Sequence, residues 1–342
     1  TLSSKTPRFI FRIIIFFLFS FSLISAVHAV PFISKKKEIE IGRSGDKQIV
    51  LQFGIYQDKS LQLYVNTIGQ KLVSKLSNKE FRKFHFKLVD SSEINAFALP
   101  GGYVYVTRGL LAALNNESEL ASVIGHEIAH VTLHHGAKLM IRSIGAQIFS
   151  VGGAIASPKN AGKWLAVSTA LFQQINMGYG REAELESDSQ GMLNSTEAGY
   201  RPIAMVNFLK NLRKQEVMSG QAYHGFQASH PETKERIVKA GTFALSLSRK
   251  YTASIFNKNI YLQKLKGLVY GGRKHLKDKN KYKSKYLDIY KVQKGDTLKS
   301  ISNKIYKDDR HSYEIATING IKESVTLNPG RILKIIRDGV YK

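Results

Sequence analysis

The motif His126-Glu127-Ile128-Ala129-His130 constrains this chain more than any other stretch of its sequence. Apolar residues recur around the motif at helical spacing, and Asn116 followed three residues later by Glu119 is typical of a capping box at a helix start. The sequence therefore predicts that a single amphipathic helix carries the motif.

Helical geometry gives the residues of this motif different tasks. Four residues make about one turn, so the imidazoles of His126 and His130 project from one face and can bind one metal ion. Glu127 lies roughly 100° further round the helix, where it misses the ion but can reach a water beside it. We therefore expect one Zn²⁺ per chain, with His126 and His130 as ligands and Glu127 as general base.

The third zinc ligand must come from another part of the chain, because a catalytic zinc site keeps three protein ligands and one open position. The densest acidic cluster, residues 181–188, places Glu184 and Asp188 four residues apart on one face of a predicted helix. We interpret Glu184 as the third ligand. Asp188 is expected to accept a hydrogen bond from a ligand histidine and so fix its tautomer. Glu182 and Glu186 are interpreted as solvated charges.

The two patterns together resemble the gluzincin metallopeptidase family of the CAAX prenyl endopeptidase, HtpX and BepA. Residues 95–111 resemble that family's edge-strand segment upstream of the zinc helix. Ser229-His230-Pro231 and Arg236 resemble its downstream histidine segment. The resemblance covers about residues 38–240 and departs at Ser187 and Ser189, where Ala and Arg are usual.

This resemblance implies an α+β fold, with a mainly helical zincin-like peptidase domain around a small β-sheet. It implies a metalloendopeptidase acting on protein or peptide substrates, with Glu127, Asp188, His230 and Arg236 as candidate catalytic residues. His230 could donate to the oxyanion of the substrate, or occupy the fourth zinc position as a plug; a structural histidine capping the next helix is a further alternative. The rival function is a protease-chaperone or envelope assembly factor with a plugged, mostly latent zinc site.

The N-terminal residues predict export. Residues 1–29 combine basic residues, an apolar run and a small-residue cleavage site, as in a secretory signal peptide, although an uncleaved anchor stays open. The peptidase domain is expected over residues 30–265, in the periplasm or cell envelope. The chain has no cysteine, which excludes disulfides and thiolate metal ligands.

Within the predicted peptidase domain, residues 35–80 have a helical apolar pattern and residues 84–89, 94–99 and 103–106 read as strands. Residues 94–99 are the expected docking edge for an extended substrate, with a plain hairpin as the alternative. Two apolar segments, 139–157 and 164–177, contain Arg, Gln and Gly residues. We therefore favour a helical hairpin beside the site over membrane spans, and contact with an envelope membrane stays open.

The C-terminal part begins with a basic stretch, residues 266–288, interpreted as a flexible linker. Residues 289–336 follow the order strand, helix, helix, strand and resemble a LysM module, a family that binds N-acetylglucosamine glycans such as peptidoglycan. The candidate glycan-binding residues are Gly295, Asp296, Thr297 and Asn319. Alternatively, Asp296 or Thr297 only caps the first helix.

Charge gives a weaker indication of partners. The formal net charge of +25 favours anionic surfaces without choosing among acidic lipids, wall polymers and nucleic acid. Because the N-terminus predicts export, we expect no nucleic-acid partner.

Overall fold

The computed structural model describes residues 33–77, 83–142, 172–173, 175, 177–219, 225–231, 234–272 and 284–341. The predicted signal peptide and most of the two apolar segments 139–157 and 164–177 lie outside these residues. The elements of the N-terminal part are α2 (Lys35–Phe53), α3 (Lys59–Val73), β1 (His85–Val89), β2 (Ala96–Leu99), β3 (Tyr103–Thr107), α4 (Arg108–Ala113), α5 (Glu117–Thr132), α8 (Arg181–Glu197), α9 (Ile203–Ser219), α10 (Phe226–Ser229), α11 (Lys234–Lys250) and α12 (Lys258–Lys264).

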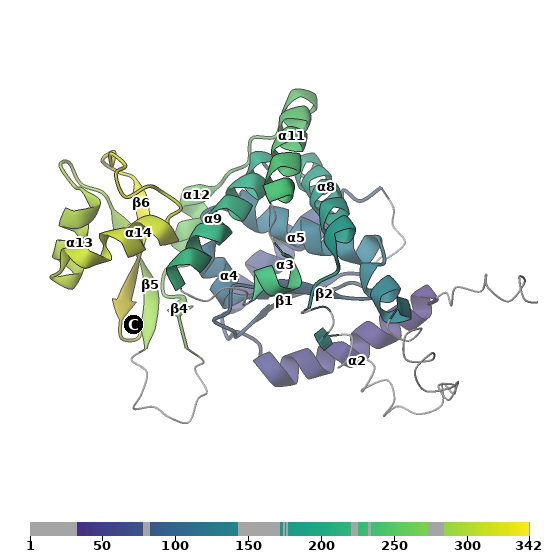
Figure 1. The fold of residues 1–342 in the computed structure, drawn as a ribbon. Coiled ribbons are helices and arrows are strands. Elements are labelled where there is room, and N and C mark those ends of the chain that lie inside the picture. The colour runs from purple at the N-terminus through teal and green to yellow at the C-terminus, as the bar shows by residue number, and fades with distance from the viewer. Residues whose placement is uncertain are drawn as a thin grey trace, which may run out of the picture.

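The predicted α+β class is confirmed, and its first sheet contains three strands in the order β1-β3-β2. Strand β3 pairs in parallel with β1 and antiparallel with β2, so β2 is an edge strand, as the sequence predicted. The sheet lies between α2 on one side and α3 and α5 on the other (Figure 1).

Alternating side chains divide between the two faces of this sheet, as expected of strands that are covered on both sides. Phe86, Leu88, Val104 and Val106 join the core formed with α3 and α5. Phe97, Leu99, Tyr103 and Tyr105 join a second core with residues of α2. The sheet therefore forms a fixed base for α5.

Helix α5 begins at the predicted cap. The side chain of Asn116 accepts a hydrogen bond from the backbone N–H of Glu119, and its amide donates to the Glu119 carboxylate at 2.8 Å. The helix ends at Thr132, and His134 adopts a left-handed φ of 58° before a new helical stretch at residues 135–142. This break changes the direction of the chain directly after the motif.

The predicted helical region 35–80 is interrupted. Helix α2 ends at Phe53, and Gly54 adopts a φ of 72°, a conformation that glycine reaches without steric cost. Ile55 then forms a bridge to Val89 before α3 begins at the side-chain cap of Asp58. The segment is therefore two helices, each with its own apolar face.

The C-terminal part forms a second three-stranded sheet in the order β4-β5-β6. Its elements are β4 (Val269–Tyr270), β5 (Lys285–Lys291), α13 (Leu298–Tyr306), the 3-10 helix η1 (Asp309–His311), α14 (Ser312–Ile318) and β6 (Ile332–Asp338). Two parts of the predicted linker 266–288 lie in this sheet, because β4 pairs with the first residues of β5. A flexible tether is therefore the wrong description of those residues; residues 273–283 lie outside the described ones.

The C-terminal part packs directly against the rest of the molecule (Figure 1). Leu287, Ile318 and Ile336 belong to the same apolar core as Tyr261 and Leu265 of the N-terminal part. Among the residues that the structure describes, none of the helices has both the length and the apolar character needed to cross a bilayer.

Lys334 of β6 makes the polar part of this contact. Its side chain is fully buried, and Nζ donates to the carbonyl oxygens of Ala112 and Leu114 at 2.7 Å each. These carbonyls lie at the C-terminal end of α4, where helix carbonyls lack intrahelical partners. The lysine therefore joins the C-terminal sheet to the loop that precedes α5.

Candidate metal centre

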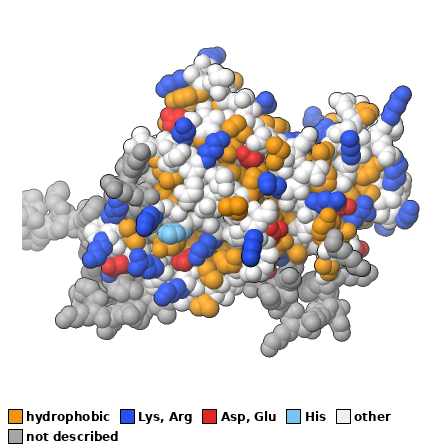
Figure 2. All heavy atoms as spheres, turned by 180° about the vertical axis from the view of Figure 1, so that it is seen from behind, with side chains coloured by type: hydrophobic (Ala, Val, Ile, Leu, Met, Phe, Trp, Pro, Cys, Tyr) orange, Lys and Arg blue, Asp and Glu red, His pale blue; other side chains and the backbone are white. Residues whose placement is uncertain are grey.

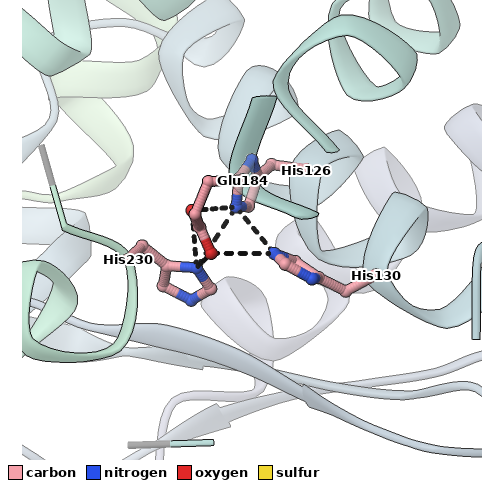
Figure 3. Close-up of side chains that lie close together, drawn as sticks. All are labelled: His126, His130, Glu184 and His230. Atoms are coloured by element: carbon pink, nitrogen blue, oxygen red, sulfur yellow. Dashed lines mark hydrogen bonds and ion pairs between the residues drawn. The ribbon is translucent and has the colours of Figure 1, made fainter. Parts of the chain in front are cut away.

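Four side chains from three elements meet in one buried cluster (Figure 3). His126 and His130 come from α5, Glu184 from the first turn of α8, and His230 from the residue that follows α10. One ligand atom from each residue lies within 4.8 Å of all the others. The three predicted ligands are thus brought together, and His230 joins them.

The spacing of these atoms suits a small cation. His126 Nε2 lies 3.0 Å from His130 Nε2, 3.2 Å from His230 Nδ1 and 3.4 Å from Glu184 Oε2. Glu184 Oε1 lies 3.0 Å from His230 Nδ1 and 3.5 Å from His130 Nε2. Four atoms held tetrahedrally at about 2.0–2.1 Å from one Zn²⁺ would be roughly 3.3 Å apart. The donor set of three imidazoles and one carboxylate therefore fits zinc in both chemistry and spacing.

Asp188 takes the position predicted for it. Its Oδ1 lies 2.9 Å from Nδ1 of His126, the ring nitrogen that faces away from the cluster. Arg236 in turn holds this carboxylate with two parallel bonds of 2.8 Å from Nε and Nη2. Arg236 Nη1 also lies 3.0 Å from Glu184 Oε2 and donates to the His230 carbonyl at 3.0 Å. Asp188 and Arg236 therefore position the predicted ligands, as expected from the sequence for Asp188, although both were also among the candidate catalytic residues.

Burial and mutual charge set the protonation of the cluster. Burial, reinforced by the charge of His126, holds the pKa of His130 well below 6.5. Burial acts to raise the pKa of Glu184, but the neighbouring His230 and His126 outweigh it and hold that pKa well below 4.5. Burial also opposes the shift of His126, whose pKa rises to about 9 because Asp188 and Glu184 stabilise its charged form. A metal ion that binds here would therefore displace a proton.

Glu127 points to the other side of the cluster, as the helical spacing predicted. It is fully buried, and neither carboxylate oxygen has a hydrogen-bond partner among the described residues. Its Oε1 lies 3.4 Å from Nε2 of His230. Burial raises the pKa of Glu127, although the charges of His230 and His126 oppose the shift. A carboxylate with free acceptor sites and a raised pKa is suited to take up a proton.

The predicted docking edge is covered in this structure. All four residues of β2 are buried, and the carbonyl of Ile94, just before β2, accepts a hydrogen bond of 2.7 Å from the N–H of Phe226. The hydroxyl of Tyr179 lies 3.2 Å from the carbonyl oxygen of Ala98. The segment that carries His230 therefore also lies along the edge strand.

The four candidate glycan residues have different surroundings. Gly295 and Thr297 are exposed, and the Thr297 side chain caps α13 by accepting from the N–H of Ser300. Asp296 is mostly buried and accepts hydrogen bonds from Tyr290, the backbone of Gln293 and Lys304.

Asn319 is a correction to the sequence prediction. It is 3% exposed, and its amide bonds the backbone carbonyls of Ile315 and Lys334 and the N–H of Lys334. The Asn319 side chain has no free group left for a sugar.

Sequence reasoning missed two residues beside His130. The ring of Tyr179 stacks on the His130 ring at 4.1 Å between centroids, and Nδ1 of His135 lies 3.0 Å from Nδ1 of His130. Gly178 and Gly180, on either side of Tyr179, have φ of 96° and 97°, so this pair of glycines was a signal for a special turn before the acidic helix. His135 had no such signal, because the helix break at His134 brings it back to the cluster.

The arrangement of the candidate ligands on two helices indicates the class of protein. Zinc-type ligands from a helical His-Glu-x-x-His motif and from a glutamate on a second helix, beside an edge-stranded sheet, are the arrangement of gluzincin metallopeptidases.

Comparison with known proteins identifies the family. The sequence pattern described as "Peptidase family M48" matches residues 59–243, and that of the LysM domain matches residues 290–335. The chain belongs to peptidase family M48 and carries a LysM domain after the peptidase region, which confirms both resemblances drawn from the sequence.

Several curated proteins are similar to this chain. The beta-barrel assembly-enhancing protease of Escherichia coli (strain K12) is 31% identical over 250 residues, which cover 70% of this chain and 50% of that protein. The protein of the same name from Yersinia pestis is 31% identical over 80% of this chain and 55% of its own length. The mitochondrial metalloendopeptidase OMA1 of Schizosaccharomyces pombe is 27% identical over 52% of this chain and 51% of its own length. This chain thus spans about half the length of the curated relatives it matches.

Proposed function

We propose that this chain is a zinc metalloendopeptidase of the cell envelope that hydrolyses peptide bonds in proteins, and that His230 closes its metal site in the resting state. The observation that carries this proposal is the cluster of His126, His130, Glu184 and His230, with its ligand atoms within 4.8 Å of one another. Family membership supports the reaction class.

The chemistry divides between the ion and the side chains. When bound, zinc supplies a Lewis acid for the scissile carbonyl and lowers the pKa of a nucleophilic water. Glu127 takes the proton of the attacking water and passes it to the leaving amine. The free carboxylate oxygens of Glu127 and its raised pKa suit both steps. Asp188 and Arg236 keep His126 and Glu184 in place.

His230 is better suited to be a plug than an oxyanion donor. Its Nδ1 lies 3.0 Å from Glu184 and 3.2 Å from His126, which is within the ligand set and not beside it. A zinc ion with four protein ligands keeps no open position for water. Release of the segment around His230 would open the metal site and would also free the Ile94 carbonyl next to the docking strand. The resting arrangement is therefore latent.

A second function shares these observations. A closed site of four ligands also suits a protease-chaperone or assembly factor that binds proteins and rarely cleaves them. The relatives named beta-barrel assembly-enhancing protease favour envelope proteins as clients. Glu127 separates the two functions, since a pure binding protein has no use for a buried base there.

The LysM domain supports attachment to the cell wall. We propose that it binds N-acetylglucosamine glycans of peptidoglycan and holds the peptidase in the periplasm or cell envelope. The exposed Gly295 and Thr297 lie in the loop that would contact the glycan. Figure 2 shows Lys and Arg side chains over one face of the molecule with few acidic ones between them, which adds a general attraction to anionic polymers.

Metal analysis tests the proposed ligand set. The purified chain is expected to bind about one zinc ion. Glu184→Ala should lose it, whereas Glu182→Ala, an exposed glutamate in the first turn of the same helix, should keep it. Equal zinc content in the wild type and in Glu184→Ala would remove the third ligand.

The role of His230 is tested by comparing peptide cleavage by the wild type and by His230→Ala at equal zinc content. A plug predicts faster cleavage after the substitution. An oxyanion donor predicts a loss of roughly a hundredfold or more. A fall in activity with zinc retained would therefore reverse the assignment.

A further inference from the structure

A second histidine lies behind His130. His130 Nε2 faces the cluster, and its other ring nitrogen, Nδ1, lies 3.0 Å from Nδ1 of His135. His135 is 5% exposed, and its Nε2 lies 3.2 Å from the carboxylate of Glu186, which is itself half exposed. The buried hydroxyl of Ser187 lies 3.2 Å from Nδ1 of His135. These contacts form a chain from the cluster to the surface.

The protons of this chain can be assigned. A neutral imidazole carries one proton, so one of two facing nitrogens must donate and the other accept. Since His130 needs a bare Nε2 to bind a metal, its proton is on Nδ1, and it donates to His135. His135 then carries its own proton on Nε2, directed at Glu186, which accepts it. In this assignment the contacts of His135 with His130 and with Glu186 each have one donor and one acceptor, and the Ser187 hydroxyl shares the Nδ1 acceptor at 3.2 Å.

The arrangement parallels the one at the other ligand histidine. Asp188 lies 2.9 Å from Nδ1 of His126, and His135 lies 3.0 Å from Nδ1 of His130. Hydrogen-bond partners of this kind fix the ligand's tautomer and orientation, and their loss costs about 10–100-fold in metal affinity.

We propose that His135 is the positioning residue for the ligand His130, with Glu186 as its outer partner and Ser187 beside it. This inference rests on the proposed zinc site. Glu186 is thereby more than the solvated charge expected from the sequence. Ser187 is one of the two positions at which the sequence departs from its family pattern. Its hydroxyl lies within hydrogen-bond distance of His135, and alanine has no such group.

The test measures zinc affinity by competition with a chromophoric chelator, for the full chain and for three variants. His135→Ala removes the acceptor. His135→Asn keeps an acceptor oxygen near the place of Nδ1. His134→Asn is the matched control, because His134 is the neighbouring histidine, its side chain pairs with Glu38, and Asn tolerates its left-handed φ. Thermal unfolding of the zinc-free proteins is recorded in parallel.

The expected result is zinc affinity about 10–100-fold weaker for His135→Ala, largely restored in His135→Asn and unchanged in His134→Asn. The unfolding temperature of the zinc-free protein should change little in all three variants. Wild-type affinity in His135→Ala would overturn the proposal. So would equal weakening in the Ala and Asn variants, because that result would indicate lost packing and not a lost acceptor. A wild type that binds no zinc would overturn the proposed metal site itself, and with it this role of His135.

Discussion

Arg236 contacts three parts of the candidate metal site at once. Its guanidinium bonds both oxygens of Asp188, contacts Glu184 and donates to the His230 carbonyl. It therefore joins the proposed ligand Glu184, the carboxylate of Asp188 behind the proposed ligand His126, and the segment of His230. The planar fork of Arg makes this possible, since Lys offers a single point charge.

Arg236→Lys should lower the free energy of unfolding of the zinc-free chain by about 3 kcal/mol, because a buried carboxylate loses its bidentate partner. Chemical denaturation measures this change. Arg249→Lys, an exposed position in the last turn of the same helix, is the control and should change little. An effect of Arg236→Lys below about 1 kcal/mol would mean that the fork is not what holds these carboxylates.

Residue patterns placed the residues of the two helical motifs, but not the side chains that reach them from distant parts of the sequence. His126 and His130, and likewise Glu184 and Asp188, are four residues apart, so helical spacing places each pair on one face of its helix. Arg236 and His230 were found by resemblance, since their contacts with Glu184 span about fifty residues of sequence. His135 depends on the left-handed conformation of His134, which no propensity of that residue indicated.

At the scale of elements, the loop between α4 and α5 connects the helix of the candidate metal centre with the C-terminal sheet. The loop contains Asn116, which caps α5. The carbonyl of Leu114 in the same loop accepts a hydrogen bond from the buried Nζ of Lys334. Burial lowers the pKa of Lys334 and raises that of Glu119, while the charge of each acts on the other in the opposite direction.

Lys334→Met should therefore lower the free energy of unfolding by about 2–4 kcal/mol, because it leaves helix-terminal carbonyls buried without a donor. Urea denaturation followed by fluorescence measures this loss. Lys322→Met, an exposed position in the same C-terminal part, is the control. Identical curves for wild type and Lys334→Met would show that the ammonium does not stabilise the contact.

Some of the elements could be predicted from the sequence and others could not. The start of α5 was predictable from its cap, and the edge position of β2 from the family resemblance. The two-residue strand β4 was not predictable, because it exists only through pairing with β5 across residues 271–284. A basic composition alone indicated a flexible segment there, and pairing overrode it.

At the scale of the whole molecule, the C-terminal domain packs against the peptidase region. Apolar residues of both parts share one core, and Lys334 bonds across the contact. In the sequence Lys334 is one of many lysines, so its burial could not be recognised there. The docking fixes the loop of Gly295 and Thr297 relative to the candidate metal centre.

Binding of the full chain to purified peptidoglycan should persist at about 0.5 M salt, where the Debye length is roughly 4 Å and attraction between exposed charges is largely screened. Sedimentation at low and high salt measures this. Chito-oligosaccharide should compete, and an oligosaccharide without N-acetyl groups should not. Binding that vanishes with salt and ignores the chito-oligosaccharide would reduce the domain to an electrostatic attachment.

The rate of peptide-bond cleavage by Glu127→Gln tests whether Glu127 is the base of a zinc-dependent peptidase. The substitution is made in the His230→Ala background, so that latency does not hide the effect, and zinc content is determined on the same samples. If Glu127 is the general base, the variant should bind equal zinc and lose at least about a hundredfold in cleavage rate. Unchanged cleavage at equal zinc content would show that Glu127 is not the base.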